Sequence, residues 1–216
     1  MTAPVDSSAS RLAVLARRAA GEREAAQERC ELCSAPIGDD HRHLLDLDRR
    51  ELLCACRACS LLFDRDAAAR GRMRLVGDRR LRLDDFTLTD AMWEQLRLPV
   101  DIAFFFDNTP AERVSAFYPG PAGATESLLR LEAWRELEAA NPILATLAPD
   151  VEALLVDRAR GARRQWIVPI DDCFALVGLI RTRWTGLTGG KAAWEAIAAF
   201  FDDLDRRSRP AGREIP

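Results

Sequence analysis

The sequence predicts an α+β protein in which a small cysteine-rich module precedes an antiparallel sheet packed with helices. Two observations predict this fold. Five of the six cysteines lie close together near the N-terminus, and further along the chain pairs of apolar, strand-like segments alternate with amphipathic helical segments. The chain of 216 residues is long enough for one ordinary domain with a small addition. It contains no repeat of fixed period, which argues against a solenoid.

The clustered cysteines form two Cys-x-x-Cys pairs. Cys30 and Cys33 make the first pair, and Cys56 and Cys59 make the second. Each pair can form a tight turn that presents two sulfurs to one metal, and the separation slightly exceeds the roughly 15–20 residues of typical zinc ribbons. We find no export signal, so we expect thiols that hold a metal rather than disulfides. The pattern predicts a zinc-ribbon or rubredoxin-like module with these four cysteines as ligands.

Three further side chains in the same region are potential metal ligands: Cys54, His41 and His43. A tetrahedral site needs four ligands, and Cys54 would change the second pair to Cys-x4-Cys, so we expect it to lie on a strand outside the site. The two histidines are spaced so that both rings face one side of a strand. We expect them to pack against the cysteine turns. A histidine ligand in the cluster and a second metal site are the alternatives.

The expected cofactor is zinc. Four thiolates suit either Zn²⁺ or a single iron ion. Ser34 and Ser60 follow the two pairs at positions where rubredoxins usually carry glycine, which favours zinc. Five clustered thiols could also supply the ligands of a four-iron iron–sulfur cluster. Iron, as a single ion or in such a cluster, is therefore the alternative.

Composition and periodicity divide the chain into five parts. We expect a disordered tail and an exposed helix over 1–27, the metal-binding module over 28–66, a linker over 67–88, the α+β domain over 89–205 and a tail over 206–216. Within the module, residues 44–48 and 51–54 predict a hairpin, and residues 61–63 predict a third short strand.

The α+β domain is expected to contain four helices and two strand pairs. In chain order these are a helix over 89–96 capped by Thr89, strands over 100–106 and 113–118, a stiff loop over 119–124, a helix over 127–139, strands over 151–156 and 165–168, a helix over 171–184 capped by Asp171 or Asp172, and a helix over 191–204. The last helix carries Trp194, Ile197, Phe200, Phe201 and Leu204 on one face. We expect this face to anchor the core, with a docking surface as the alternative.

Several segments together resemble a known group of proteins. They are CELC, HRHLLDL, CACRACSLLF, LPVDIAFFFDNT, YPGPAGATESLL, DVEALLVDR and PIDDCFALVGLIRTRWTGLTGG. They look like a family of uncharacterised bacterial proteins, mainly from actinobacteria, encoded beside NiFe-hydrogenase genes. The resemblance covers roughly residues 28–204. It implies a role near hydrogenase assembly or electron transfer, with a hydrogenase subunit or maturation factor as the partner.

The sequence carries none of the common enzyme motifs. It contains no Walker loop, G-x-S-x-G elbow, H-E-x-x-H helix or dinucleotide fingerprint. Cys173 is expected to be a buried structural thiol. The sequence leaves catalysis open and favours a non-enzymatic metal-binding accessory protein that docks a partner through its zinc site. The alternatives are a rubredoxin-like iron electron carrier, a metallochaperone and a zinc-ribbon regulator that binds nucleic acid.

Charge and hydropathy narrow the choice of partners. The net charge is −3 and the pI is about 5.6, so the surface as a whole does not attract nucleic acid, although residues 41–82 are rich in arginine. The apolar runs are far shorter than the roughly 20 residues that a membrane helix needs. We therefore expect a cytoplasmic protein without a membrane span that acts on a protein partner.

Overall fold

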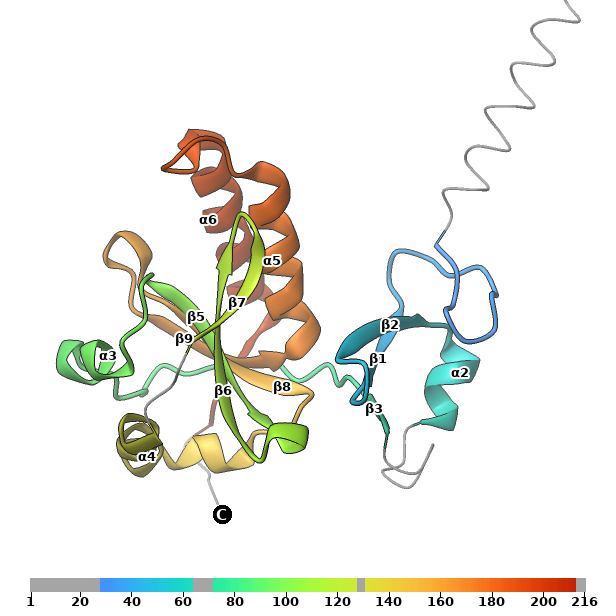
Figure 1. Cartoon of the computed structure of the whole chain (residues 1–216), viewed down its shortest axis with the longest axis horizontal. Helices are drawn as coiled ribbons and strands as arrows, with labels where there is room; N and C mark the ends of the chain where they lie inside the picture. Colours follow the sequence, from blue (N-terminus) through green and yellow to red (C-terminus); the bar gives the residue numbers. More distant parts are fainter. Residues whose placement is uncertain (1–27, 64–71, 128–130, 213–216) are drawn as a thin grey trace, which may run out of the picture.

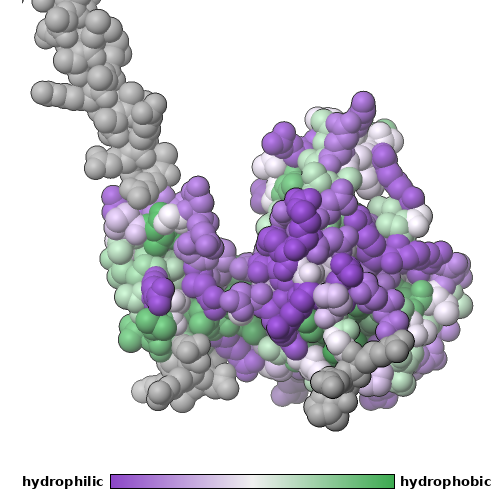
Figure 2. All heavy atoms as spheres, turned by 180° about the vertical axis from the view of Figure 1, so that it is seen from behind, coloured by the Kyte–Doolittle hydropathy of each residue, from purple (hydrophilic) through white to green (hydrophobic). Residues whose placement is uncertain are grey.

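The computed structural model describes residues 28–63, 72–127 and 131–212. Figure 1 shows a small unit, with a three-stranded sheet and helix α2, beside a larger unit built on a seven-stranded sheet. The predicted α+β class is confirmed, because an antiparallel sheet packs against helices and four cysteines lie close together in the small unit. Seen from behind, the larger unit presents a mainly hydrophilic face (Figure 2).

The small unit is built on a β-hairpin. Strand β1 (Arg42–Asp46) pairs with β2 (Glu51–Ala55), as predicted, and β3 (Met73–Leu75) pairs with the other edge of β1. The carboxylate of Asp46 accepts hydrogen bonds from two amides of the turn between β1 and β2. This bonding satisfies the turn amides and thereby fixes the hairpin register.

The predicted strand over 61–63 is wrong. Helix α2 (Arg57–Leu62) occupies this segment, because Cys56 caps its first turn. The side chains of Leu61 and Leu62 are 64% and 70% exposed, and within this apolar run only Phe63 packs against the small core.

The segment over 67–88, expected to be a linker, contains two strands in its described part. Strand β3 belongs to the small sheet, and β4 (Leu81–Arg82) pairs with the large one. Arg79 makes a bidentate ion pair with Glu152, and Arg80 makes another with Asp172. The sequence of residues 67–88 did not predict these strands, because each is only two or three residues long and shows no clear alternation. The division of the chain into separate domains stays a prediction.

The larger sheet has the strand order β10-β4-β9-β8-β5-β6-β7. Its strands are β4, β5 (Ile102–Asn108), β6 (Arg113–Gly120), β7 (Gly123–Ser127), β8 (Glu152–Asp157), β9 (Arg164–Pro169) and β10 (Arg209–Pro210). All neighbours are antiparallel except β10 and β4. Helices cover both faces, so the central strands read as nearly continuous apolar runs. Every residue of β8, for example, is buried.

Helices α3 (Asp90–Leu96) and α4 (Leu131–Ala140) pack on one face of the sheet, and α5 (Ile170–Arg183) and α6 (Gly190–Arg207) pack on the other. Short 3-10 helices span Thr109–Ala111, Pro142–Thr146 and Ala159–Gly161. Thr89 caps α3 as predicted. Within the described ranges, no helix combines the length and apolar character needed to cross a membrane.

Three expectations about these elements are corrected. The predicted loop over 119–124 is a hairpin, because β6 continues to Gly120 and β7 begins at Gly123. Asp171 and Asp172 do not cap α5. Helix α5 starts one residue earlier, after Pro169, and both carboxylates lie in its first turn. The expected tail over 206–216 contributes the end of α6 and strand β10, whose backbone bonds to β4.

The apolar face of α6 reaches the core along most of its length. Ile197, Phe201 and Leu204 are buried, whereas Trp194 and Phe200 are only partly buried. The ring of Phe201 stacks on that of Trp166 in β9, with the ring centroids 5.2 Å apart. Cys173 is fully buried in α5, as expected, and burial raises the pKa of its thiol well above the usual value.

Candidate metal centre

The structure brings the two Cys-x-x-Cys pairs together. The sulfurs of Cys30, Cys33, Cys56 and Cys59 all lie within 4.8 Å of one another, and those of Cys33 and Cys56 are 3.7 Å apart. Zn–S bonds of about 2.3 Å in a tetrahedron place neighbouring sulfurs about 3.8 Å apart. The residues present therefore fit one four-coordinate metal ion.

The first pair sits on a tight turn. The amide of Ser34 donates to the carbonyl of Cys30 (2.7 Å), and the amide of Cys30 donates to Ala35 (2.8 Å). Ser34 adopts a left-handed backbone, with φ of 61°. This conformation closes the turn and leaves the side chains of Cys30 and Cys33 on one side.

The second pair sits at the start of helix α2. The sulfur of Cys56 accepts a hydrogen bond from the amide of Cys59 (3.4 Å) and so acts as the helix cap. The amide of Ser60 donates to the carbonyl of Cys56 (2.9 Å). The second cysteine pair therefore lies on a turn that opens directly into helix α2.

Without a metal, the thiols of Cys30 and Cys59 have very different pKa values. Burial raises the pKa of Cys30, but hydrogen bonds from three backbone amides of the two turns lower it further, to about 6. Hydrogen bonding to the Cys33 side chain, together with burial, raises the pKa of Cys59 to about 12. A bound cation would supply the positive charge that stabilises all four thiolates.

One side of the cluster faces the protein and the other faces solvent. Cys30 and Cys59 are buried against a small core of Ile37, Leu44 and Ala55, whereas Cys33 is exposed. The inner ligands are thus shielded from water, and the outer edge is accessible to a partner or to a chelator.

The three additional candidates form a group of their own. Cys54 lies in β2 directly opposite His43 in β1, and His41 lies two residues before His43 on the same side. Ligand atoms of these three side chains are within 4.8 Å of one another, and Cys54 does not belong to the four-cysteine group. The carboxylate of Asp171 accepts a hydrogen bond from His43 (2.8 Å) and raises the pKa of that histidine.

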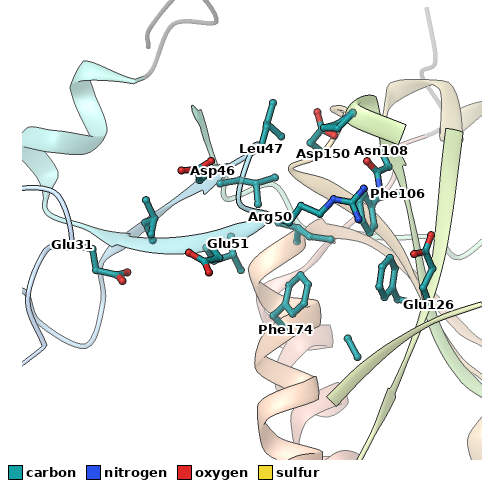
Figure 3. A pocket seen from close by; sticks show the side chains of 17 residues that line it. Glu31, Asp46, Leu47, Arg50, Glu51, Phe106, Asn108, Glu126, Asp150 and Phe174 are labelled. Atoms are coloured by element: carbon teal, nitrogen blue, oxygen red, sulfur yellow. The ribbon is translucent and has the colours of Figure 1, made fainter. Parts of the chain in front are cut away.

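Two features of this region had no signal in the sequence. The first is the contact between His43 and Asp171, which joins the small unit to α5 across 128 positions of the chain. The second is a cleft of about 780 Å³ between the small unit and the larger one. Figure 3 shows Phe106, Phe174 and Arg50 pointing into this cleft from opposite sides. Both features arise from packing between distant segments, which no local pattern encodes.

The cleft has an apolar floor and an acidic rim. Its floor contains Phe106, Phe117 and Phe174, and the last of these is 38% exposed. The carboxylates of Glu31, Asp46, Glu51, Glu126 and Asp150 line it, with Arg50 as the only basic lining residue among those described. Asp150 and Glu126 are already paired with Arg74 and Arg113, which lie outside the lining. The cleft therefore suits an apolar side chain that has a positively charged side chain next to it.

Comparison with known proteins identifies a family. No curated protein and no solved structure matches the chain. One family described as being of unknown function, DUF5947, matches residues 29–208, a range that includes all four clustered cysteines and nearly all of the larger unit. The chain therefore belongs to the family DUF5947.

Proposed function

We propose that this protein is a non-enzymatic zinc-binding accessory protein that docks a protein partner. The observation that carries the proposal is the spacing of the four cysteine sulfurs, with 3.7 Å between those of Cys33 and Cys56. This spacing suits a closed, four-ligand site, which is typical of zinc that stabilises a small fold rather than zinc that catalyses a reaction.

The same spacing disfavours an iron–sulfur cube. In a four-iron cluster each cysteine binds a different iron atom, so the sulfurs stand further apart than the ligands of one ion. Sulfurs within 4.8 Å of one another fit a single ion instead. Zinc is the proposed occupant, and its content in protein purified without added metal, with Cys59→Ala as the comparison, tests the assignment.

We assign partner docking to the cleft between the two units. Its aromatic floor and the exposed carboxylate of Glu51 are complementary to an apolar side chain with a basic residue beside it on a partner protein. Phe174 is suited to a test because it is partly exposed and lies in the cleft. Phe174→Asp is expected to abolish co-purification of the partner while zinc content stays normal. Because the ring of Phe174 also packs edge-on against Phe104, the melting temperature should fall, and binding is compared at a temperature where both proteins are folded.

Leu187→Asp is the matched control for this test, because the side chain of Leu187 is 99% exposed and does not line the cleft. The resemblance of the sequence to hydrogenase-associated proteins makes a NiFe-hydrogenase subunit or maturation factor the first partner to test. Equal capture of such a subunit by the wild type and by Phe174→Asp would refute docking in the cleft.

A single-iron electron carrier is the second candidate. It is favoured by the exposure of Cys33, because a ligand at the surface shortens the path of an electron to a partner. Iron fits four thiolates at the same spacing as zinc. A colourless protein with about one four-thiolate zinc per chain would eliminate this candidate. A red protein with thiolate-to-iron absorption would instead show that iron occupies the four-cysteine site.

A further inference from the structure

A second group of metal-ligating side chains lies beside the four-cysteine cluster and takes no part in it. His41, His43 and Cys54 place one ligand atom each within 4.8 Å of the other two. The rings of the two histidines have centroids 4.8 Å apart and an interplanar angle of 63°. Two imidazoles and a thiolate are a donor set that suits zinc and copper.

The β-hairpin of the small unit builds this group. His43 and Cys54 are direct cross-strand partners, so their side chains leave the same face of the sheet. Glu31 holds Cys54 through both backbone groups, because its amide donates to the Cys54 carbonyl (2.9 Å) and its carboxylate accepts from the Cys54 amide (2.6 Å). The thiol is thus fixed on a regular strand rather than on a loop.

His41 offers a buried nitrogen that has no partner. Its Nδ1 lies 2.8 Å from the carbonyl of Gly38, and only a protonated nitrogen can donate to a carbonyl. This bond assigns the proton to Nδ1 and leaves a lone pair on Nε2. The side chain is 9% exposed, and Nε2 is buried without a hydrogen-bond partner in the described part of the chain. A buried acceptor without a partner is unfavourable unless a ligand satisfies it.

His43 is oriented in the way that metal-binding histidines usually are. Its Nδ1 donates to the carboxylate of Asp171 at 2.8 Å, which leaves Nε2 available. A carboxylate behind the imidazole fixes the ring and makes the free nitrogen a better ligand. The carboxylates of Glu28 and Glu31 add negative charge nearby, at 3.5 Å from His41 Nδ1 and 2.6 Å from the Cys54 amide.

We propose that His41, His43 and Cys54 form a second metal site, which binds Zn²⁺ or a similar borderline transition-metal ion. Three protein ligands leave the fourth position of a tetrahedron to water or to an incoming group, unlike the closed four-cysteine site. This site goes beyond the proposed function, which requires only one zinc. Asp171 belongs to α5 and holds His43. A metal bound at the second site would therefore also strengthen the contact between the small unit and the larger one.

The metal content of zinc-equilibrated, desalted protein tests the second site. The wild type is expected to retain two zinc ions per chain, and Cys54→Ser and His41→Gln are expected to retain one. Asp40→Asn, an exposed change one residue before His41 that lies outside both the cleft and the cysteine and histidine groups, is the matched control and should retain two. The zinc that stays in the four-cysteine site shows that each variant is folded.

Cobalt substitution and a positioning variant provide the second readout. Removal of Cys54 should abolish the absorption of cobalt bound to two nitrogens and one sulfur, and should leave the thiolate-rich spectrum of the other site. Asp171→Asn should weaken only the second zinc, by roughly 10–100-fold in competition with a chelator.

One zinc in both the wild type and Cys54→Ser, with the same cobalt spectrum, would overturn the second site. Loss of both ions from Cys54→Ser would overturn it as well, because Cys54 would then belong to the first site. A zinc content unaffected by Cys59→Ser would instead refute the four-cysteine site of the proposed function, so the two failures are distinct.

Discussion

Two serines in equivalent sequence positions have different conformations. Ser34 and Ser60 each follow the second cysteine of a pair. Ser34 has a φ of 61°, in the left-handed region that favours glycine. Ser60 lies in helix α2, is buried, and donates from its hydroxyl to the carbonyl of Arg57 (2.9 Å). The same substitution should therefore have opposite effects at these two positions.

Ser34→Gly is expected to stabilise the metal-bound small unit by up to about 1 kcal/mol, because glycine adopts the left-handed conformation without steric cost. Ser60→Gly is expected to destabilise it by about 1–2 kcal/mol, through helix propensity and the lost hydrogen bond. The rate of zinc transfer to a chromogenic chelator should fall for the first variant and rise for the second. A change in the same direction for both would contradict the conformational argument.

Asp157 and Arg164 form a mostly buried ion pair between β8 and β9. The Asp157 side chain is 4% exposed and accepts from Arg164 at 2.8 Å, while the guanidinium lies over the ring of Phe201. Burial raises the pKa of Asp157, although Arg164 acts to lower it. A carboxyl with a raised pKa binds its proton more readily in the folded chain, so its contribution to stability falls as the pH rises through that pKa.

Arg164→Ala is expected to cost about 3–5 kcal/mol at pH 7, because it leaves the buried carboxylate unpaired. The pKa of Asp157 should then rise further, and the deficit relative to the wild type should shrink as the pH falls from 7 towards the unfolded value of about 3.9. Urea unfolding at several pH values measures this difference. The double variant with Asp157→Asn should recover part of the stability and lose the pH dependence; a pH-independent deficit in the single variant would exclude the unpaired charge as its cause.

At the scale of elements, α6 fastens one face of the sheet by a short stripe of side chains. Phe201 is fully buried on Trp166, whereas Trp194 is only partly buried. The indole of Trp194 lies under the guanidinium of Arg160 and donates to the carbonyl of Thr188 (2.9 Å). Phe201 therefore anchors the core, and Trp194 packs near the start of the helix against Arg160 in the connection between β8 and β9.

Phe201→Ala is expected to cost about 3–5 kcal/mol of unfolding free energy, because it removes a buried aromatic ring and leaves a cavity. Trp194→Ala should cost clearly less, since its ring is partly exposed. Denaturant unfolding of both variants measures the difference, with zinc content as the control for the small unit. An equal or larger loss for Trp194→Ala would place the anchor at the start of the helix.

At the scale of the whole molecule, a small unit that holds the four-cysteine cluster contacts a unit with a large hydrophobic core. The small unit has few buried apolar residues, and two of them are candidate ligands, Cys30 and Cys59. Structural zinc contributes roughly 10 kcal/mol or more of folding free energy to such small units. The larger unit has extensive cores on both faces of its sheet and does not contain the four-cysteine cluster. The two units should respond differently to metal removal.

Chelation of the metal is expected to unfold the small unit and to leave the larger one folded. All five tryptophans lie at position 93 or beyond, so their fluorescence reports on the larger unit. We expect thiol reagents to react with the clustered cysteines after chelation while the tryptophan emission and most of the helical circular dichroism remain. A red shift of the emission together with thiol exposure would mean that the two units unfold as one.

The local patterns of the sequence were sufficient for the fold class, the hairpin of the small unit, the strand pairs of the large sheet and the α6 stripe. They were also sufficient to single out Cys30, Cys33, Cys56 and Cys59, because equal spacing within two pairs is a local property. Periodicity and spacing are properties of short stretches of sequence, and each of the correctly predicted features is defined within such a stretch. Short strands such as β3 and β4 were not predicted, because two or three residues are too few to show a periodic pattern.

Contacts between distant segments became visible only in three dimensions. The contact of His43 with Asp171 on α5 joins segments 128 positions apart. The cleft lined by both units and the nitrogen of His41 that has no partner among the described residues likewise depend on tertiary packing. The conformational difference between Ser34 and Ser60 is of the same kind, since one turn closes on itself and the other opens a helix. Residue type and spacing can propose candidate ligands of a metal. Burial, orientation and unsatisfied polar atoms arise from packing, and these show which side chains lie together.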